Sequence, residues 1–241
     1  MSLITSNLIE VRQRLELAAA AVQRKPQDIQ LLAVSKTFPA EAVEEAVHAG
    51  QTAFGENYVQ EGVEKIQELA KLRPLLQWHF IGPLQSNKTK EVAQHFDWIH
   101  SIDRLKIAER LSAQRGDYPE LDALQLCVQV NVSEEESKGG VSLPETEALC
   151  IAIANLPHVT LRGLMAIPAP SPDLSEQHAA FAKLKACFAQ IKLKHSTAIG
   201  FEHFDTLSMG MSDDLEAAVA EGSTMVRVGS AIFGKRAKIN T

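Results

Sequence analysis

The 241-residue sequence has no excess of positive charge, no paired cysteines and no long apolar run. Its formal net charge of −6 argues against a nucleic-acid-binding surface. Cys127, Cys150 and Cys187 form no CxxC pair, so they are expected to be reduced thiols in the core. No stretch approaches the ~18 apolar residues of a membrane span, and residues 1–7 lack the basic and apolar regions of a secretion signal. We therefore expect a soluble, cytoplasmic protein that binds neither nucleic acid nor membranes.

Two further absences narrow the classes of binding site. No GxGxxG motif follows the first predicted strand, which removes the strongest reason to expect a dinucleotide-binding fold. No spacing of histidine, cysteine and aspartate resembles a set of metal ligands. The class of binding site is therefore predicted from the pattern of strands and from the residues that follow them.

Short apolar runs with the character of buried strands alternate with helical patterns along the whole chain. The runs lie at about residues 29–35, 52–55, 77–81, 97–101, 124–132, 160–167, 206–208 and 225–228. This alternation predicts an α/β fold, a single (β/α)8 TIM barrel that comprises residues 1–241 as one domain. A doubly wound open sheet is the alternative. An extra helix precedes the first strand, with Leu8, Val11 and Leu15 at helical spacing behind the polar triplet 5–7.

Lys36 stands at the end of the first buried run, just before a turn that contains Pro39. An ammonium group at the end of a buried strand is costly unless it is paired, neutralised or used chemically. Because desolvation lowers the pKa of an amine and makes it nucleophilic, lysines in this position are suited to Schiff-base chemistry. The alternative is a lysine whose stem packs while its charge reaches solvent or a carboxylate.

Glycine and serine follow the seventh and eighth strands, where (β/α)8 barrels often bind phosphate. The first segment is Ser208–Asp214, in which a helix is expected to start at Ser212, and the second is Gly229–Gly234. Glycine allows the backbone to approach an anion closely, and exposed N–H groups at a helix start can bind it. Ordinary tight loops contain the same residues, but the pair of segments at these two positions favours a phosphate site.

Other polar residues near strand ends are candidates for ligand contacts. Arg227 alternates with apolar neighbours in the eighth strand, so its side chain points either into the barrel or toward the helices. Asn57 and Tyr58 follow the second strand, and His79 and His100 lie at the ends of the third and fourth. A lysine after strand one with a phosphate site after strands seven and eight indicates a phosphorylated aldehyde, a description that pyridoxal 5′-phosphate fits.

Several longer motifs resemble those of one family over essentially the whole chain. They are LLAVSKTFP around Lys36, FGENYVQE from Phe54, WHFIGPLQSNK from Trp78, GLMAIP from Gly163, LSMGMSDDLEAA from Leu207 and GSTMVRVGSAIFG from Gly222. These segments are similar to the YggS/PROSC-type pyridoxal-phosphate-binding proteins, which function in pyridoxal phosphate homeostasis. The resemblance implies a barrel like the N-terminal domain of alanine racemase, without that enzyme's C-terminal β-domain.

The resemblance also implies a role for six residues in binding pyridoxal phosphate. They are Lys36 as the Schiff-base lysine, Ser208, Gly229 and Ser230 at the phosphate, Arg227 facing the pyridine nitrogen, and Asn57 near the ring.

The resemblance implies a non-catalytic protein that buffers pyridoxal phosphate or delivers it to apoenzymes, acting as a monomer. A small amino-acid racemase is the second hypothesis, and a class I aldolase-like lyase without cofactor is the third. A cationic Arg227 would disfavour a protonated ring, and Tyr58 and Tyr118 are the only tyrosines available as a second acid or base. Lys138 is the first candidate for a secondary cofactor site.

Overall fold

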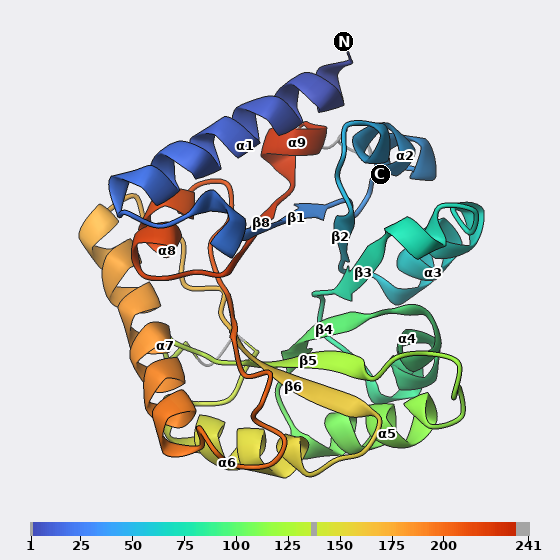
Figure 1. Ribbon diagram of the computed structural model, residues 1–241, viewed down its shortest axis with the longest axis vertical. Helices are drawn as coiled ribbons and strands as arrows, with labels where there is room; N and C mark the ends of the chain where they lie inside the picture. The colour runs from blue at the N-terminus through green and yellow to red at the C-terminus, as the bar shows by residue number, and fades with distance from the viewer. Residues whose placement is uncertain (1, 136–138, 235–241) are drawn as a thin grey trace.

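The eight parallel strands of the computed structural model close into a barrel, in which each strand pairs with the next and β8 pairs with β1 (Figure 1). The strands are β1 (Gln30–Val34), β2 (Ala53–Glu56), β3 (Gln77–Phe80), β4 (Trp98–Ile102), β5 (Leu124–Gln129), β6 (Val159–Met165), β7 (Thr206–Ser208) and β8 (Met225–Val228). The pairing of Leu31 with Val226 and of Leu32 with Arg227 closes the sheet. The predicted (β/α)8 barrel is therefore confirmed, and the open sheet is excluded.

Helices surround this barrel in the described residues, 2–135 and 139–234. The α-helices are α1 (Leu3–Ala21), α2 (Ala40–His48), α3 (Val59–Glu68), α4 (Thr89–His95), α5 (Leu105–Arg115), α6 (Leu143–Ala154), α7 (Leu174–Lys194), α8 (Leu215–Ala220) and α9 (Ser230–Phe233). Short 3-10 helices are η1 (Pro26–Asp28), η2 (Arg73–Leu75) and η3 (Ser86–Lys88).

Alternation along the strands separates two layers of core. Side chains on one face of each strand, such as Ala33 and Phe54, pack under the helices in the larger hydrophobic cluster. Residues of the opposite parity form a smaller cluster inside the barrel, which consists of Leu32, Val34, Ala53, Ile81, Trp98, Cys127, Met165 and Met225. Because successive side chains of a strand point to opposite faces, Arg227 has the parity of Met225 and points into the barrel.

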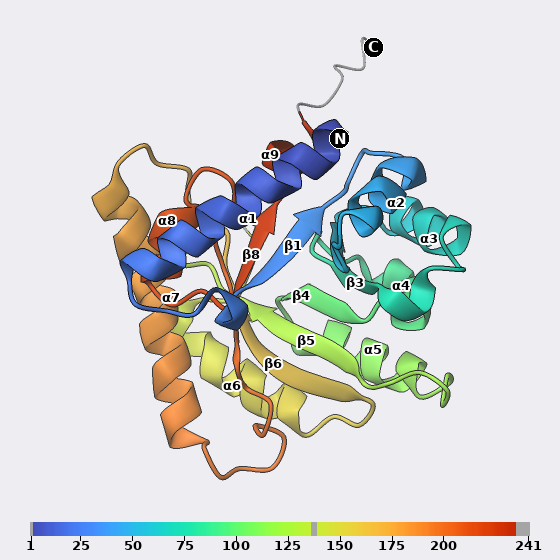
Figure 2. The same cartoon turned by 45° about the horizontal axis from the view of Figure 1, so that its top comes forward.

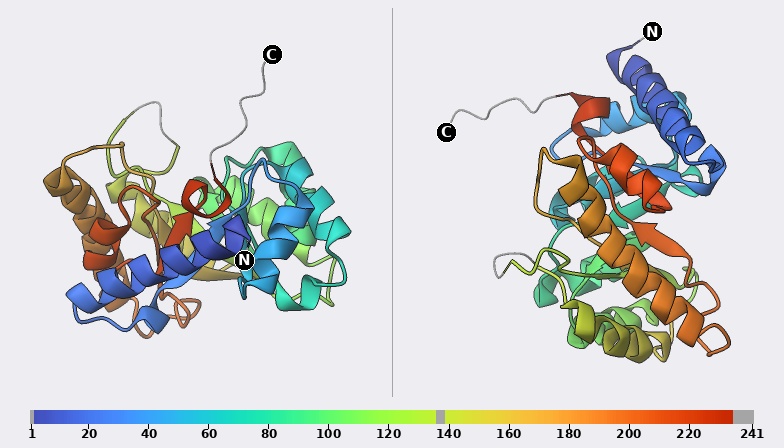
Figure 3. Two further views of the ribbon diagram at one scale, coloured as in Figure 1. Left: turned by 90° about the horizontal axis from the view of Figure 1, so that it is seen from above. Right: turned by 90° about the vertical axis from the view of Figure 1, so that its left-hand side faces the viewer.

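The extra N-terminal helix, α1, packs against the outside of the barrel, beside the helices that follow the last two strands. Figure 2 and Figure 3 show α1 alongside α8 and α9, which follow the last two strands. Its buried face contains Leu8, Val11 and Leu15, as its helical spacing predicts. This arrangement brings α1 next to the two loops in which a phosphate site is expected.

Two predicted helix starts are wrong by about one turn. α1 begins at Leu3, because the Ser2 hydroxyl already accepts the N–H of Thr5, so the polar triplet 5–7 lies inside the helix. α8 begins at Leu215 after Asp214 instead of at Ser212. Residues 211–213 therefore remain a loop at the carboxyl end of the barrel.

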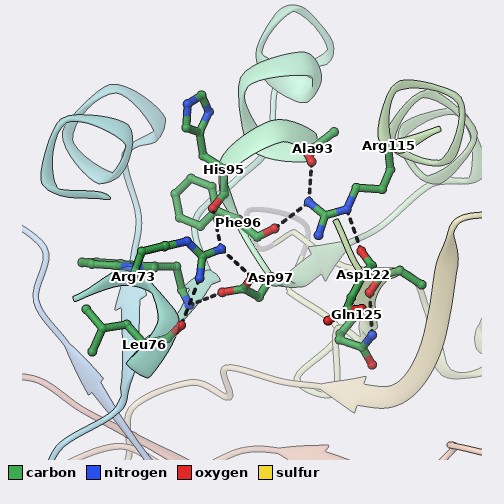
Figure 4. A network of polar contacts seen from close by, with 11 residues as sticks. Arg73, Leu76, Ala93, His95, Phe96, Asp97, Arg115, Asp122 and Gln125 are labelled. Atoms are coloured by element: carbon green, nitrogen blue, oxygen red, sulfur yellow. Dashed lines mark hydrogen bonds and ion pairs between the residues drawn. The ribbon is translucent and has the colours of Figure 1, made fainter. Parts of the chain in front are cut away.

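The amino end of the barrel is held by arginines that donate to backbone carbonyls (Figure 4). Arg115 is almost fully buried and donates to the carbonyl oxygens of Ala93, Phe96 and Asp122 at 2.6–3.0 Å. Arg73 pairs with Asp97 at 2.6 Å, at the entrance to β4. These contacts join the loops that lead into β3, β4 and β5, so this end has a structural role.

The three cysteines are free thiols that differ in burial. Cys127 and Cys150 are buried free thiols, and burial raises the pKa of Cys127 to about 12. Cys187 is also free and half-buried. Within the described residues, no helix has the length and apolar character to cross a membrane, and no three metal-binding side chains gather into a cluster.

Candidate functional site

A cavity of about 270 Å³ opens at the carboxyl ends of β1, β2 and β8. Its lining includes five residues predicted from the sequence as ligand contacts: Lys36, Asn57, Arg227, Gly229 and Ser230. The remaining lining residues are Val34, Phe38, Ile81, Ile167, Met211, Ser212, Asp213 and Gly234. The barrel thus brings together residues separated by nearly 200 positions, in a cavity with apolar walls and a few polar groups that is typical of small-molecule sites.

Lys36 reaches the cavity because it continues the inward parity of β1. Leu32 and Val34 lie in the interior cluster, and Lys36 comes two residues after Val34, half-buried at the mouth. Thr37, the next residue, has a φ of +68°. A left-handed conformation is rare for a β-branched residue, so the chain turns away immediately after Lys36 at an energetic cost.

The backbone beside Lys36 contacts a buried ionic cluster, the Lys65 cluster, made of Ser35, Glu56, Glu61 and Lys65. The Lys65 ammonium lies 2.8 Å from Glu56 Oε1, 2.6 Å from Glu61 Oε1 and 2.8 Å from the carbonyl oxygen of Ser35. The Ser35 hydroxyl donates to the same Glu56 oxygen at 2.6 Å. Burial nevertheless raises the pKa of Glu56 above its usual range.

Sequence reasoning missed this cluster. Helical spacing explains only part of it, since Glu61 and Lys65 form an i,i+4 pair on α3. The signal that could have revealed the rest is Glu56, an acidic residue at the end of a strand whose other residues are apolar or glycine. A carboxylate in that position needs a partner, and an ion-pairing lysine on the following helix is the nearest source.

Arg227 is a buried cation whose hydrogen bonds, in the described chain, go to uncharged groups. Its side chain donates to the Ser208 hydroxyl at 2.7 Å and to the carbonyl oxygen of Ala166 at 2.9 Å. Among the described residues, no acidic oxygen forms a salt bridge with it. Burial lowers the pKa of Arg227 to about 10, so the guanidinium remains charged at neutral pH. A buried charge of this kind is stabilised when a ligand supplies a hydrogen-bond acceptor.

Behind Arg227, a chain of hydrogen bonds runs through the interior of the barrel. Ser208 Oγ lies 2.8 Å from His100 Nδ1, and His100 Nε2 lies 2.9 Å from His79 Nδ1. Burial lowers the pKa of His79 to about 3, and burial together with His79 and Arg227 lowers the pKa of His100 well below 6.5. Both imidazoles are therefore neutral, and they support Arg227 rather than line the cavity.

Ser208 and Ser212 differ in where they lie. Ser208, predicted at the phosphate, is fully buried beneath Arg227, and its hydroxyl contacts Arg227 and His100. Ser212, four residues later, lies in the loop after β7 and lines the cavity. The loop geometry could not be read from the sequence, because Ser212 was expected to begin a helix that starts instead at Leu215.

Backbone donors from the second loop also face the same region. Gly229 precedes α9, and within the described chain the N–H groups of Ser230 and Ala231 have no backbone acceptor. A side chain at position 229 would crowd the strand, because its Cβ would lie 3.2 Å from the Val34 carbonyl oxygen. The glycine thus lets this loop sit directly against the end of β1.

Helix α1 braces both loops. Arg14 donates to the carbonyl oxygen of Ser212 at 2.6 Å and forms two hydrogen bonds with Glu216. Asn7 donates to the carbonyl oxygen of Ile232 in α9 at 2.8 Å. These two contacts were not predicted, because the sequence gives no indication of which side of the barrel the extra helix covers.

The donor set fits a phosphorylated pyridine aldehyde. Lys36 supplies an amine, Arg227 a guanidinium that forms no salt bridge within the described residues, and the loops at residues 212 and 229–230 supply N–H and hydroxyl donors for a phosphate. Asn57 Oδ1 is buried without a hydrogen-bond partner in the described chain, so its amide is available to a ligand. Lys138, the predicted secondary site, lies outside the described residues.

Comparison with known proteins is consistent with this chemistry. Residues 7–237 match the family model of the alanine racemase N-terminal domain. A pyridoxal phosphate homeostasis protein of Escherichia coli (strain K12) is 53% identical over 237 residues, which is 98% of each chain. PipY of Synechococcus elongatus PCC7942, in a structure with PLP bound, is 38% identical with a TM-score of 0.81, covering 96% of this chain and 100% of PipY.

Alanine racemase of Corynebacterium glutamicum shares the barrel at 18% identity and a TM-score of 0.64. The match covers 99% of this chain and 62% of the racemase, so the likeness shows the fold alone. The full-length matches at higher identity decide the family, and this chain belongs to the pyridoxal phosphate homeostasis proteins, with the barrel of the alanine racemase N-terminal domain.

Proposed function

We propose that this chain binds pyridoxal 5′-phosphate in the cavity at the carboxyl end of the barrel and holds it reversibly for pyridoxal phosphate homeostasis. The observation that carries the proposal is the convergence of Lys36, the buried cation Arg227 and two loops of anion donors on one cavity of about 270 Å³. When bound, the cofactor supplies an aldehyde that condenses with a primary amine and a ring that can accept electron density.

Each group in the cavity has a role in this proposal. Lys36 captures the aldehyde, and the backbone donors at Gly229 and Ser230 hold the phosphate. Ser212 replaces Ser208 as the serine that contacts the phosphate, while Ser208 orients Arg227. Arg227 faces the pyridine nitrogen, and the amide of Asn57 contacts the ring substituents.

We propose a carrier rather than an enzyme because the cavity offers little acid–base chemistry. Arg227 is charged at neutral pH, and a cation beside the ring nitrogen disfavours protonation of the ring. In the described chain the lining contains no histidine, tyrosine or cysteine, so the carboxylate of Asp213 is the one side chain besides Lys36 that could serve as a second acid or base. Tyr58 is 56% exposed and is not part of the lining.

We also propose that residues 1–241 act as one domain and as a cytoplasmic monomer that passes the cofactor to apoenzymes. One chain supplies the amine of Lys36, the guanidinium of Arg227 and the donors at Gly229 and Ser230, which supports binding without a second subunit. Light scattering of the purified protein, with and without pyridoxal phosphate, tests the monomer. A dimer that forms only with the cofactor would contradict it.

Titration of the protein with pyridoxal phosphate, followed by absorbance, tests the proposed function. We expect a saturable band with one cofactor per chain that borohydride removes. The same sample is then incubated with D- or L-alanine, beside a Lys36→Ala control. Interconversion well above the control would replace the carrier by a racemase, and a protein that stays colourless would contradict cofactor binding and favour an aldolase-like lyase.

A further inference from the structure

We infer that the Lys65 cluster is a positioning device for Lys36, which sets how fast the lysine captures an aldehyde without contributing to the affinity for the rest of the ligand. This inference rests on the proposed function of Lys36. Lys65, Glu56 and Glu61 are positioning residues in it, because they act through the backbone on either side of Lys36.

The Lys65 cluster forms hydrogen bonds with both residues that flank Lys36 in the chain. On one side, Lys65 donates to the carbonyl oxygen of Ser35 at 2.8 Å, and the Ser35 hydroxyl donates to Glu56 at 2.6 Å. On the other side, the N–H of Thr37 donates to Glu61 Oε1 at 2.5 Å. Since Lys65 also pairs with Glu61 and Glu56, the hydrogen bonds on the two sides of Lys36 belong to one connected network.

The hydrogen bond from the Thr37 N–H to Glu61 occurs at a residue whose backbone is strained. Thr37 has a φ of +68°, a conformation that a β-branched residue adopts only when its surroundings hold it there. The Glu61 carboxylate accepts the Thr37 N–H and so stabilises this turn. The turn in turn fixes the direction in which the Lys36 side chain leaves the end of β1.

Stability alone gives no reason for so many buried charges. The side chains of Glu56 and Lys65 are 0% and 6% exposed, and apolar residues of similar volume usually replace a buried ion pair without loss of stability. All three N–H donors of Lys65 are used, whereas Glu56 Oε2 is buried and has no hydrogen-bond partner among the residues that the structure describes. The cluster is therefore better explained by the geometry that it imposes on its neighbours.

The packing of α3 is adapted to the cluster. At Gly62, a Cβ would lie 2.6 Å from the ring of Phe96 and 3.3 Å from Glu56 Cβ. The glycine lets α3 approach the end of β2 closely enough for Lys65, one turn later, to reach Glu56 and Ser35. The helix, the strand ends and the turn at Thr37 thus form one rigid unit.

Arg227 and the phosphate contacts come from β8 and from the loops after β7 and β8, not from β2 and α3, which carry the ionic residues of the Lys65 cluster. In the described chain, no hydrogen bond or ion pair joins Arg227 to that cluster. Loss of the cluster should therefore slow covalent capture while leaving the binding of a phosphorylated ring without an aldehyde unchanged. A merely structural role would weaken both together.

The experiment compares two ligands on three variants. Stopped-flow absorbance gives the rate of capture of pyridoxal phosphate, and calorimetry gives the affinity for pyridoxine 5′-phosphate, which lacks the aldehyde. In Glu61→Ala, we expect capture to slow by roughly tenfold or more, since a small misplacement of a reacting group costs up to ~10²-fold. Glu61→Gln keeps an acceptor for Thr37 and should recover most of the rate. The control Glu68→Ala removes an exposed carboxylate of the same helix and should match the unsubstituted protein.

The outcomes separate this inference from the proposed function. If the unsubstituted protein captures no pyridoxal phosphate, the proposed function fails and the inference fails with it. If it does capture the cofactor but Glu61→Ala does so at the same rate, only the positioning role is overturned. An equal loss of capture and of pyridoxine 5′-phosphate affinity would also overturn it. If Glu61→Ala does not fold, Ser35→Ala takes its place, because it removes the hydroxyl that donates to Glu56 on the other side of Lys36. Slower capture in Ser35→Ala with unchanged pyridoxine 5′-phosphate affinity supports the inference, and an unchanged rate overturns it.

Discussion

The two ends of the barrel both contain buried charged side chains, but these are satisfied in different ways. At the amino end, Arg115 gives its hydrogen bonds to three backbone carbonyls, and Arg73 pairs with Asp97 (Figure 4). At the carboxyl end, Arg227 has no acidic partner among the described residues, and Glu56 Oε2 has no partner either.

This difference distinguishes buried polar groups that stabilise the fold from buried polar groups that can serve a function. A buried group whose hydrogen bonds are all made within the protein contributes to folding, and its removal leaves its partners unsatisfied. A buried group that lacks a partner, or a strained residue such as Thr37, raises the energy of the protein unless a ligand or a geometric requirement explains it. The strained Thr37 lies beside Lys36, and Lys36, Asn57 and Arg227 line one cavity, so we place the function at the carboxyl end.

The largest expected effect is that of Lys36→Ala on covalent capture. Removal of the amine should abolish the borohydride-sensitive band completely, while part of the affinity remains because the phosphate contacts are intact. Unfolding by urea should be unchanged within experimental error. Absorbance and a denaturant curve check both statements, with Lys106→Ala, an exposed lysine of α5, as the control. A band that survives at full strength would contradict the role of Lys36.

Arg115→Met tests the amino end and should have the opposite profile. The substitution removes three hydrogen bonds to backbone carbonyls, which should lower the free energy of unfolding by about 3 kcal/mol, at ~1 kcal/mol for each bond. Molecules that remain folded should bind one pyridoxal phosphate as before. Lys106→Met, on the exposed face of the same helix, provides the matched control. A loss of binding without a loss of stability would contradict a structural role for the amino end and a functional role for the carboxyl end.

His79→Phe tests the hydrogen-bonded chain that supports Arg227. The pKa of His79 is about 3 in the folded protein and 6.5 in an unfolded chain, so the unfolded state binds more protons between these values. Stability should therefore fall as the pH falls from 6.5, by about 2 kcal/mol at pH 5 for this one group. The variant should lose that part of the pH dependence, which urea unfolding at several pH values measures. His48→Phe, at an exposed histidine, should keep the slope of the unsubstituted protein.

The smallest expected effect is that of Arg14→Ala on the phosphate loops. The variant loses the contact to Ser212 and the ion pair with Glu216, and a partly exposed ion pair contributes less than about 1 kcal/mol to stability. The affinity for pyridoxine 5′-phosphate should weaken by roughly threefold, which corresponds to ~0.7 kcal/mol. Calorimetry measures the change, beside Glu10→Ala on the exposed face of α1. An unchanged affinity would mean that α1 does not position the loop.

The sequence predicts the barrel and much of the cavity for a physical reason. Strand parity and the common end of parallel strands are local properties, so Lys36, Asn57 and Arg227 could be expected at one mouth. The loops after β7 and β8 could be placed by their order alone. The direction of Arg227 needed the register of β8 against β1, which the sequence leaves open.

What the sequence did not predict depends on contacts between separate elements. The Lys65 cluster joins β1, β2 and α3, and helical periodicity indicates only that Glu61 and Lys65 share a face. The position of Ser212 in the cavity lining follows from a helix that starts three residues later than expected. The bracing by Arg14 depends on the side of the barrel that α1 covers. None of these is encoded in a local pattern.

Peptide mapping after borohydride reduction of the protein with pyridoxal phosphate tests the central claim most directly. We predict one pyridoxyl group per chain, attached to Lys36, with the other lysines unmodified at stoichiometric cofactor. An adduct on a different lysine, or no adduct under conditions in which the protein is folded, would contradict the assignment of the cavity as the site that holds the cofactor.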